Sequence, residues 1–353
     1  MRPPRPHARP LEGQRPDAPG AITAGLPLTI APMLPAAGGE PFDSPAHLFE
    51  VMWSGVRAIA FVEGGRVRVQ DRFCRDVTQR YPELQEISPQ LNGSGIVLDG
   101  EIVALDARGR PDFALLRPRL ASDDPGEAKR LAARTPVTFQ AFDILYKDGR
   151  RLMSEPLRRR KSVLRQCARL PGPLAVPDFV EREGIAFFEA VRQHGLEGIV
   201  AKERESRYLP GQRSRAWAKL RVYEKDEFVI CGFTYGGPIK GRMGPRSRRP
   251  LASLLLGLYD EGGRLRYVGE VEGGFADASL DETVRILDDV ASRVCPLDPP
   301  PALARLVFWC RPCLAASVRY AGWTRDGSLR FPLFESLRPD VPAESCRLEG
   351  RGR

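Results

Sequence analysis

The sequence has few lysines, few histidines and no long apolar run. The scarcity of histidine argues against a zinc site, and the lack of an apolar run argues against a membrane-spanning protein. All seven lysines lie at or beyond Lys129, and arginine supplies most of the positive charge. The three histidines are scattered and do not accompany the Cys310 and Cys313 pair, so no four-ligand zinc site is predicted and structural thiols are expected. No apolar stretch approaches the roughly 20 residues of a membrane-spanning helix, which excludes a transmembrane protein.

Length, charge and cysteine usage then define the broad class. The chain has 353 residues, enough for two domains of ordinary size, and 42% of its residues are hydrophobic. A formal charge of +9 and a pI near 9.4 favour an anionic partner, with nucleic acid first, although an arginine-rich coding bias would give the same balance. Seven scattered cysteines without an apolar signal segment indicate reduced thiols in an intracellular, cytoplasmic protein.

The composition and the predicted secondary structure change along the chain. Residues 1–25 are rich in Pro, Arg and Gly and predict a disordered basic arm. From 26 to 222 short strands alternate with helices, and from 223 to 345 the pattern is β-rich, with 346–353 as a tail. The clearest helices are predicted at 156–170, with a basic outer face, and at 184–194, where Gly195 can follow the last turn.

The β-rich part also has one helical signal. Strands are predicted at residues 228–233, 254–259, 264–271, 306–310 and 315–320. Ser279 and Glu282 form a capping box that predicts a helix start. This helix would place Leu280, Val284, Leu287 and Ala291 on one face.

Residues 50–59 (EVMWSGVRAI) carry the most informative pattern of the chain. Interpreted as a strand, with side chains alternating between two faces, the segment places Glu50, Met52 and Ser54 on one face. Val51 and Trp53 lie on the other face, which is expected to be core. A thioether therefore lies between a carboxylate and a hydroxyl on the face that should line a polar pocket.

This segment resembles the nucleophile motif of ATP-dependent DNA ligases, Glu-x-Lys-x-Asp-Gly-x-Arg, and other motifs of that family follow in order. The similar segments are the carboxylate strand at 97–106, the adenine-covering strand at 142–145, the metal-and-phosphate motif at 197–202, the phosphate-binding strand at 217–221 and the C-terminal motif at 329–340. Six motifs in order cover roughly residues 26–345, and together they resemble the bacterial ATP-dependent ligases associated with end joining.

The resemblance implies an α+β fold of two domains. An adenylation (nucleotidyltransferase) domain at 26–222 would hold the nucleotide between antiparallel sheets. A β-rich OB-fold domain at 223–345 would follow it.

The resemblance places Met52 where the family has its nucleophilic lysine, and Ser54 where it has an aspartate. In the family, the lysine amine attacks the α-phosphate of ATP, AMP passes to the 5′-phosphate of a nick, and the 3′-hydroxyl displaces it. A thioether has no N–H and forms no stable link to phosphorus, so self-adenylation is expected to be lost. Arg338 and Asp340, which would orient the β- and γ-phosphates in that step, are kept, but Val341 replaces the lysine that follows them.

Other sites that the resemblance implies are largely kept. Residues expected to bind ATP or AMP are Glu50, Arg57, Arg72, Phe142, Lys202 and Lys219. Glu101 and Glu197 are expected to hold Mg²⁺, which prefers carboxylate and phosphate oxygens. DNA phosphates are expected to contact Arg75, in a turn where Cys74 replaces a family glycine, and the basic loop at 236–250. The cations of that loop are Lys240, Arg242, Arg246, Arg248 and Arg249.

Three functions stay open at this point. The first is a nick- or end-binding pseudo-ligase in DNA repair or recombination, with duplex DNA and other repair proteins as partners. The second is a partial enzyme that seals nicks already carrying 5′-AMP, because that step needs metal, a phosphate clamp and the 3′-hydroxyl but no lysine nucleophile. The third is an active ATP-dependent DNA ligase with a nucleophile elsewhere.

Overall fold

The computed structural model describes residues 25–169, 171–236, 251–275, 277–303, 306–324 and 326–348, with the backbone alone for 277–281. The chain divides into two compact units with the boundary between Arg221 and Val222. Within the described residues, no helix is long and apolar enough to cross a membrane.

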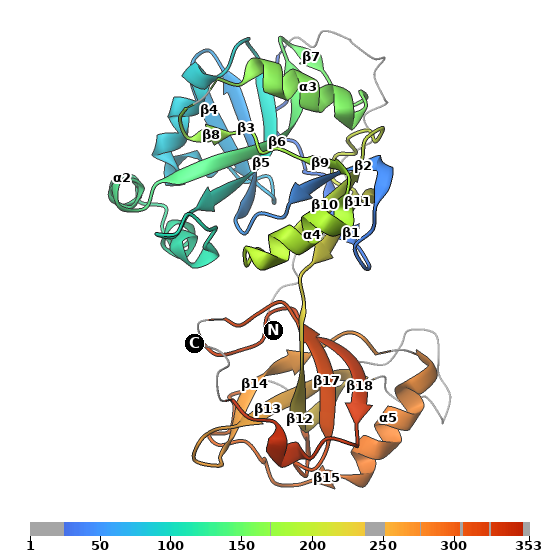
Figure 1. Ribbon diagram of the computed structural model, residues 1–353. Coiled ribbons are helices and arrows are strands. Elements are labelled where there is room, and N and C mark those ends of the chain that lie inside the picture. The colour runs from blue at the N-terminus through green and yellow to red at the C-terminus, as the bar shows by residue number, and fades with distance from the viewer. Residues whose placement is uncertain are drawn as a thin grey trace, which may run out of the picture. The chain divides into compact units, whose positions relative to one another are not determined.

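The first unit contains two β-sheets with short helices around them (Figure 1). One sheet has the strand order β1-β11-β10-β2-β9 and is antiparallel except for the β1–β11 pair. Its strands are β1 (Leu34–Ala37), β2 (Ser44–Val51), β9 (Val180–Arg182), β10 (Gly198–Glu203) and β11 (Arg213–Arg221). The other has the order β4-β3-β5-β6-β7, with β8 parallel to β6. Its strands are β3 (Val56–Glu63), β4 (Arg66–Asp71), β5 (Ile96–Ala104), β6 (Val137–Lys147), β7 (Arg150–Arg151) and β8 (Leu174–Ala175).

The second of these sheets is covered on both faces, because its strands are apolar on both. All residues from Ala58 to Val62 of β3 are buried, as expected for a strand with two covered faces. One face joins Leu48 and Trp217 of the first sheet in a shared core. The other packs under short helices, with Leu84 and Leu164 in its core.

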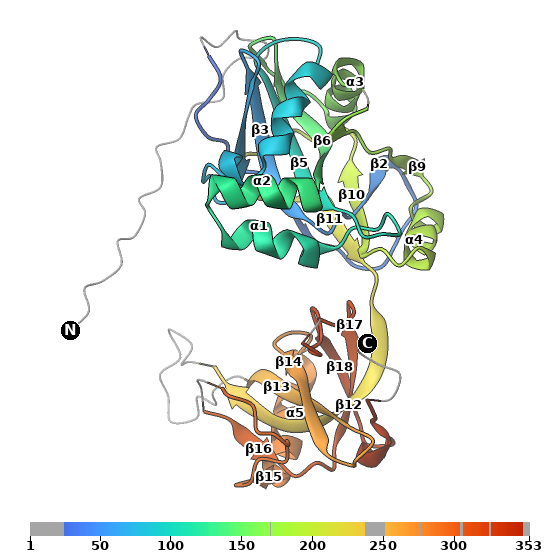
Figure 2. The same cartoon turned by 90° about the vertical axis from the view of Figure 1, so that its left-hand side faces the viewer.

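The helices of the first unit lie around these sheets (Figure 2). They are η1 (Thr78–Arg80), η2 (Pro82–Gln90), η3 (Phe113–Leu116), α1 (Arg117–Ala121), α2 (Pro125–Arg134), α3 (Leu157–Cys167) and α4 (Gly184–Gln193). The two helices that the sequence predicted here, α3 and α4, are present, and Gly195 after α4 has a φ of +68°. The basic outer face predicted for α3 includes the exposed Arg158, Arg159 and Arg165, but not every cation of the helix lies on it. Arg160 and Lys161 are both buried, because each meets a buried carboxylate.

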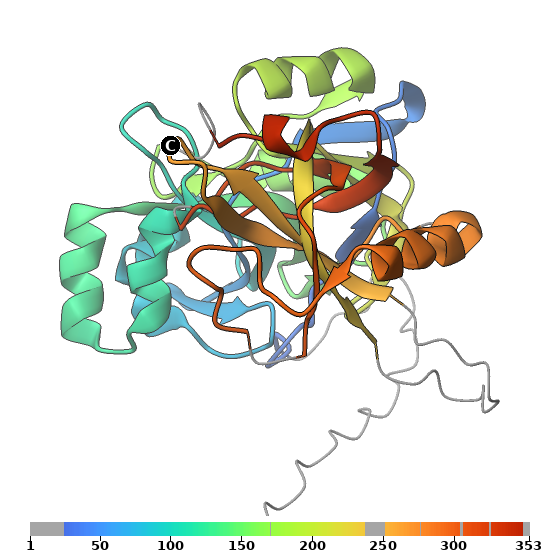
Figure 3. The same cartoon turned by 90° about the horizontal axis from the view of Figure 1, so that it is seen from below.

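The second unit is β-rich, with α5 at its edge (Figure 3). Its elements are β12 (Glu224–Tyr235), β13 (Leu251–Tyr259), β14 (Leu265–Val271), α5 (Asp277–Asp289), β15 (Ala291–Ser292), β16 (Phe308–Cys310), β17 (Ala315–Tyr320), β18 (Leu333–Arg338) and η4 (Ala343–Ser345). β12 pairs with β13 and with β17, which also pairs with β18. The α+β fold class is confirmed, because a first unit of two sheets with surrounding helices is followed by a β-rich second unit.

Three details of this unit differ from the sequence expectations. α5 already includes Ser279, because the helix starts at Asp277, and Ala291 lies in β15 rather than on the helix face. Val284 and Leu287 are buried as expected. The strand predicted at 306–310 starts only at Phe308, and Leu306 is 74% exposed.

Candidate functional site

A pocket lies between the two sheets of the first unit, with a volume of about 60 Å³. Strand register explains which side chains face it. Val200 of β10 pairs with Glu50 of β2 on one side and with Lys219 of β11 on the other. Lys202 and Trp217, each two residues away and paired with each other, share that face. The opposite wall comes from Arg57, Glu101 and Phe142, whose strands β3, β5 and β6 are neighbours.

Met52 lines this pocket directly after the last residue of β2. β2 ends at Val51, so the predicted alternation does not continue through Ser54. The Met52 N–H donates to the carbonyl of Gly198 at 2.9 Å, and the side chain is 5% exposed. Met52 lines both the pocket and an adjoining cavity of about 270 Å³, which Ser54 and Glu197 also line. The expectation that Val51 and Trp53 face the core is wrong: both are half-buried and line the pocket, because β2 ends at Val51 and the strand alternation ends with it.

Glu50 is buried between two lysines. Its Oε2 lies 2.9 Å from Nζ of Lys202, and its Oε1 lies 2.6 Å from Nζ of Lys161 on α3. Burial opposes ionisation of this carboxyl, but the two ammonium groups outweigh that effect and hold its pKa below the usual range. Burial in turn lowers the pKa of Lys202 to about 8, against the opposing charge of Glu50. The pocket therefore contains a carboxylate with a lowered pKa beside a lysine whose pKa is also lowered, to about 8.

An aromatic pair forms the apolar wall. Phe142 and Trp217 meet edge to face, with ring centroids 6.3 Å apart. Nζ of Lys202 lies 4.2 Å from the Phe142 centroid and 4.3 Å from the Trp217 centroid, and the Arg57 guanidinium lies 4.6 Å from Phe142. A flat ring flanked by cations suits a base that carries phosphates.

Arg57 is fixed by a buried carboxylate. It forms a bidentate ion pair with Asp99, at 2.6 and 2.7 Å, and donates to the Met33 carbonyl at 3.0 Å. Tyr208 donates to the same carboxylate at 2.7 Å. Asp99 and Tyr208 were not identified from the sequence. Asp99 lies inside the carboxylate strand motif, so its place beside Glu101 was the available signal.

A second charged group combines the metal-ligand candidates with Lys219. Burial raises the pKa of Glu101 to about 7, although Arg57 and Lys219 oppose the rise. Burial also lowers the pKa of Lys219, and the neighbouring Arg221 adds to that effect. Glu197 lies 3.6 Å from the Arg221 guanidinium. A divalent cation would relieve the cost of ionising Glu101, so the donors fit Mg²⁺ that completes its shell with phosphate oxygens.

The described residues contain no group of three or more protein ligands that would hold a metal alone. Mg²⁺ in phosphate-transfer sites commonly shares its coordination between one or two carboxylates, water and substrate phosphates. Here Mg²⁺ would neutralise phosphate charge. Glu101 and Glu197 would orient it.

Arg72 and Arg75 lie in a tight turn outside the pocket. Asp71 closes the turn by accepting from the N–H groups of Phe73 and Arg75, at 2.8 and 3.0 Å. Cys74 has a φ of +64°, so the turn keeps the conformation that favours glycine despite the substitution. Arg72 is exposed over Phe73 and does not line the pocket, while Arg75 lines a separate groove of about 1030 Å³.

The remaining predicted residues lie elsewhere. Arg338 at the end of β18 pairs with Glu227 at 2.7 Å and, through two hydrogen bonds, with Asp340. The Arg338 hydrogen bond holds the pKa of Asp340 at about 2. The loop cations Lys240, Arg242, Arg246, Arg248 and Arg249 lie outside the described residues.

The aromatic pair, three cations and the carboxylates of Glu50 and Glu101 line one pocket between the two sheets, an arrangement typical of a nucleotidyltransferase. Comparison with known proteins gives the family. The model of the ATP dependent DNA ligase domain matches residues 38–221, and that of the ATP dependent DNA ligase C terminal region matches 247–341. The chain belongs to the ATP-dependent DNA ligase family, bacterial end-joining type.

Relatives at moderate identity span most of the chain. It is 35% identical over 322 residues to the multifunctional non-homologous end joining DNA repair protein LigD of Mycobacterium tuberculosis, which covers 90% of this chain and 40% of LigD. It is 31% identical to the SPbeta prophage-derived DNA ligase-like protein LigB of Bacillus subtilis, over 58% of this chain and 72% of LigB. The chain thus spans about 40% of the length of the LigD relative.

A solved structure, mycobacterial DNA ligase D complexed with ATP and MES, is similar with 34% identity and a TM-score of 0.51. It covers 90% of this chain and 97% of that one.

Proposed function

We propose that this protein binds nicked or broken duplex DNA as a ligase homologue that does not adenylate itself. The observation that carries the proposal is Met52, which lies at the position of the family's nucleophile with its backbone fixed to Gly198 and its side chain lining the pocket. A thioether offers no amine to attack phosphorus, and Ser54 adds no charge beside it. Partners in DNA repair or recombination belong to the same proposal.

The rest of the pocket supports adenine nucleotide binding. Phe142 and Trp217 provide the aromatic wall, and Lys202, Lys219 and Arg57 supply positive charge for phosphates. The similar mycobacterial structure was solved with ATP. ATP or AMP is therefore the proposed ligand, with Mg²⁺ at Glu101 and Glu197.

A second candidate function follows from the same retained groups. Sealing a nick that already carries 5′-AMP needs the phosphate clamp, metal-ligating carboxylates and a positioned 3′-hydroxyl, but no lysine nucleophile. Lys219 and Glu101, the proposed phosphate and metal contacts for this step, line one pocket with Met52, which supports this second candidate.

Binding measured against salt tests the first function. The full-length protein is titrated with a nicked duplex, the same duplex intact, and heparin, at two or more salt concentrations. We expect the nicked duplex to bind best and to weaken steeply with salt, because phosphate contacts release counterions. Binding of the nicked duplex no tighter than heparin would contradict the proposal.

Two nicked substrates separate the candidate functions. One carries a 5′-phosphate and is supplied with ATP and Mg²⁺; the other carries a 5′-AMP and is supplied with Mg²⁺ alone. Sealing of the second only would establish the partial enzyme. Sealing of neither, with tight nick binding, would leave the pseudo-ligase.

A further inference from the structure

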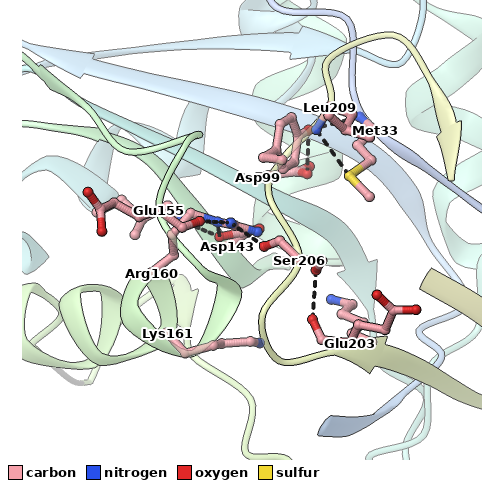
Figure 4. Close-up of polar contacts among 12 residues, drawn as sticks. Met33, Asp99, Asp143, Glu155, Arg160, Lys161, Glu203, Ser206 and Leu209 are labelled. Atoms are coloured by element: carbon pink, nitrogen blue, oxygen red, sulfur yellow. Dashed lines mark hydrogen bonds and ion pairs between the residues drawn. The ribbon is translucent and has the colours of Figure 1, made fainter. Parts of the chain in front are cut away.

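Lys161 is a buried lysine that lies outside the six sequence motifs. It projects from α3 next to Arg160 (Figure 4), and its side chain is 3% exposed. Its Nζ lies 2.6 Å from Oε1 of Glu50, a residue that lines the nucleotide pocket. Lys161 itself does not line the pocket. It therefore approaches the carboxylate from outside the space that a nucleotide would fill.

The two oxygens of Glu50 are divided between two cations. Lys161 takes Oε1, and Lys202, whose ammonium also faces Phe142, takes Oε2. The nearby Asp143 is neutralised by a bidentate pair with Arg160, at 2.8 Å for each bond. Glu50 therefore has two cationic partners, Lys202 inside the pocket and Lys161 outside it. An ionised carboxylate in this setting accepts hydrogen bonds and cannot donate one.

We propose that Lys161 is a positioning residue for base selection, which fixes Glu50 as an ionised acceptor and so favours purines with an amino group at position 6 over those with an oxo group. The proposal rests on the nucleotide pocket of the proposed function. An amino group donates to a carboxylate. An oxo group would face the carboxylate as a second acceptor, so no hydrogen bond would form between them, which costs binding free energy.

Removal of Lys161 changes what Glu50 can do. With Lys202 as its remaining partner, the buried carboxyl is easier to protonate, because burial disfavours its charged form. A protonated carboxyl can donate to a 6-oxo group. Removal of Lys161 should therefore reduce the selectivity between bases. It should affect the binding of phosphates much less, because Lys219 and Arg57 would contact them.

Affinities for ATP and ITP, which differ at purine position 6, test this directly in the full-length protein. Isothermal titration compares the wild type with Lys161→Met, Lys161→Arg and, as a matched control, Arg159→Met from the exposed side of the same helix. We expect a wild-type preference for ATP of at least about tenfold, as for one hydrogen bond to a charged group. The preference should fall toward one in Lys161→Met and remain in the other two variants.

A pH series separates positioning from packing. The groups that face Glu50 and Lys202 are Lys161, Asp143 and Arg160, with Arg57 and Glu101 across the pocket. In Lys161→Met the preference for ATP should return as pH rises and Glu50 loses its proton, whereas the wild-type preference should stay constant over the same range. A packing defect would not restore the preference with pH.

Several outcomes would overturn the proposal. These are an unchanged ATP to ITP ratio in Lys161→Met, an equal loss of both nucleotides at every pH, or a wild type that binds neither nucleotide. The last result leaves nick binding, and with it the proposed function, to be judged by the DNA titration. If Lys161→Met does not fold, Glu50→Gln serves instead: its amide can donate as well as accept, so the ratio should fall, and an unchanged ratio would contradict the proposal.

Discussion

The N–H of Met52 donates to the carbonyl of Gly198 at 2.9 Å, so the residue at the nucleophile position is joined by its backbone to the neighbouring strand. Gly198 has a φ of +141°, and a Cβ there would lie 2.2 Å from the Leu220 carbonyl oxygen. Only glycine fits this close approach. The backbone of Met52 is therefore held by its surroundings, at the position where the motif resemblance leads us to expect a nucleophile.

If Met52 replaces a lysine nucleophile, as we propose, substitution should restore self-adenylation. Met52→Lys combined with Ser54→Asp is expected to form a covalent AMP adduct with ATP and Mg²⁺, because the amine would enter a pocket whose other groups are in place. Intact-protein mass detects the adduct, and Met52→Leu with Ser54→Asp is the control without an amine. A revertant that neither binds ATP nor becomes labelled would show that the pocket has changed beyond these two positions.

Lys219 provides a test of the phosphate site. Lys219→Gln is expected to weaken ATP binding about tenfold, since a hydrogen bond from a charged group to phosphate is lost. Lys225→Gln is the matched control, because Lys225 is 58% exposed and pairs with Glu335 in the second unit. Equal affinities of the two variants for ATP would argue against a phosphate at Lys219.

Glu101 links stability to pH. Its pKa of about 7 in the folded protein exceeds the usual 4.5, so the folded state holds the extra proton between these values. Its stabilising contribution is complete below pH 4.5 and is lost as pH rises through 7. Glu101→Gln, which stays neutral, should therefore gain on the order of 1 kcal/mol over the wild type at pH 8. Denaturant unfolding at pH 4.5 and pH 8 measures the difference in unfolding free energy between Glu101→Gln and the wild type. An equal difference at both pH values would contradict the prediction.

The buried pair of Arg160 and Asp143 tests what anchors α3. Both side chains are 0% exposed, and Arg160 also donates to the carbonyls of Glu155 and Ser206, at 2.5 and 3.0 Å. Arg160→Met should destabilise the protein by about 3–5 kcal/mol, because it leaves a buried carboxylate unpaired. Arg158→Met is the control: its pair with Glu205 is exposed and should contribute less than about 1 kcal/mol. Similar unfolding midpoints for the two variants would contradict this role.

Sequence patterns identified the fold class because six motifs in order constrain it more than any single element does. They also placed Glu50, Phe142, Lys202 and Lys219 at one pocket, and the strand register shows why. The alternation assigned to residues 50–54 failed after Val51, because the chain leaves the strand there. A period-two pattern cannot show where a strand ends.

The partners of buried charges could not be predicted in the same way. Arg160 and Lys161 sit in a run of cations on α3, and nothing in that run distinguishes the buried pair from its exposed neighbours. Their carboxylates, Asp143 and Glu50, come from strands distant in sequence. The turn at Cys74 could not be predicted either. The Asp71 side chain stabilises this turn, so Cys74 adopts the positive φ without a glycine.

The mass of the intact wild-type protein after incubation with ATP and Mg²⁺ tests the loss of self-adenylation most directly. A pyrophosphate-treated sample, from which any AMP bound at purification is removed, provides the reference mass. We expect no AMP adduct on the wild type. An adduct would contradict the assignment of Met52 as a lost nucleophile, and mapping the modified residue would then identify the group that replaces it.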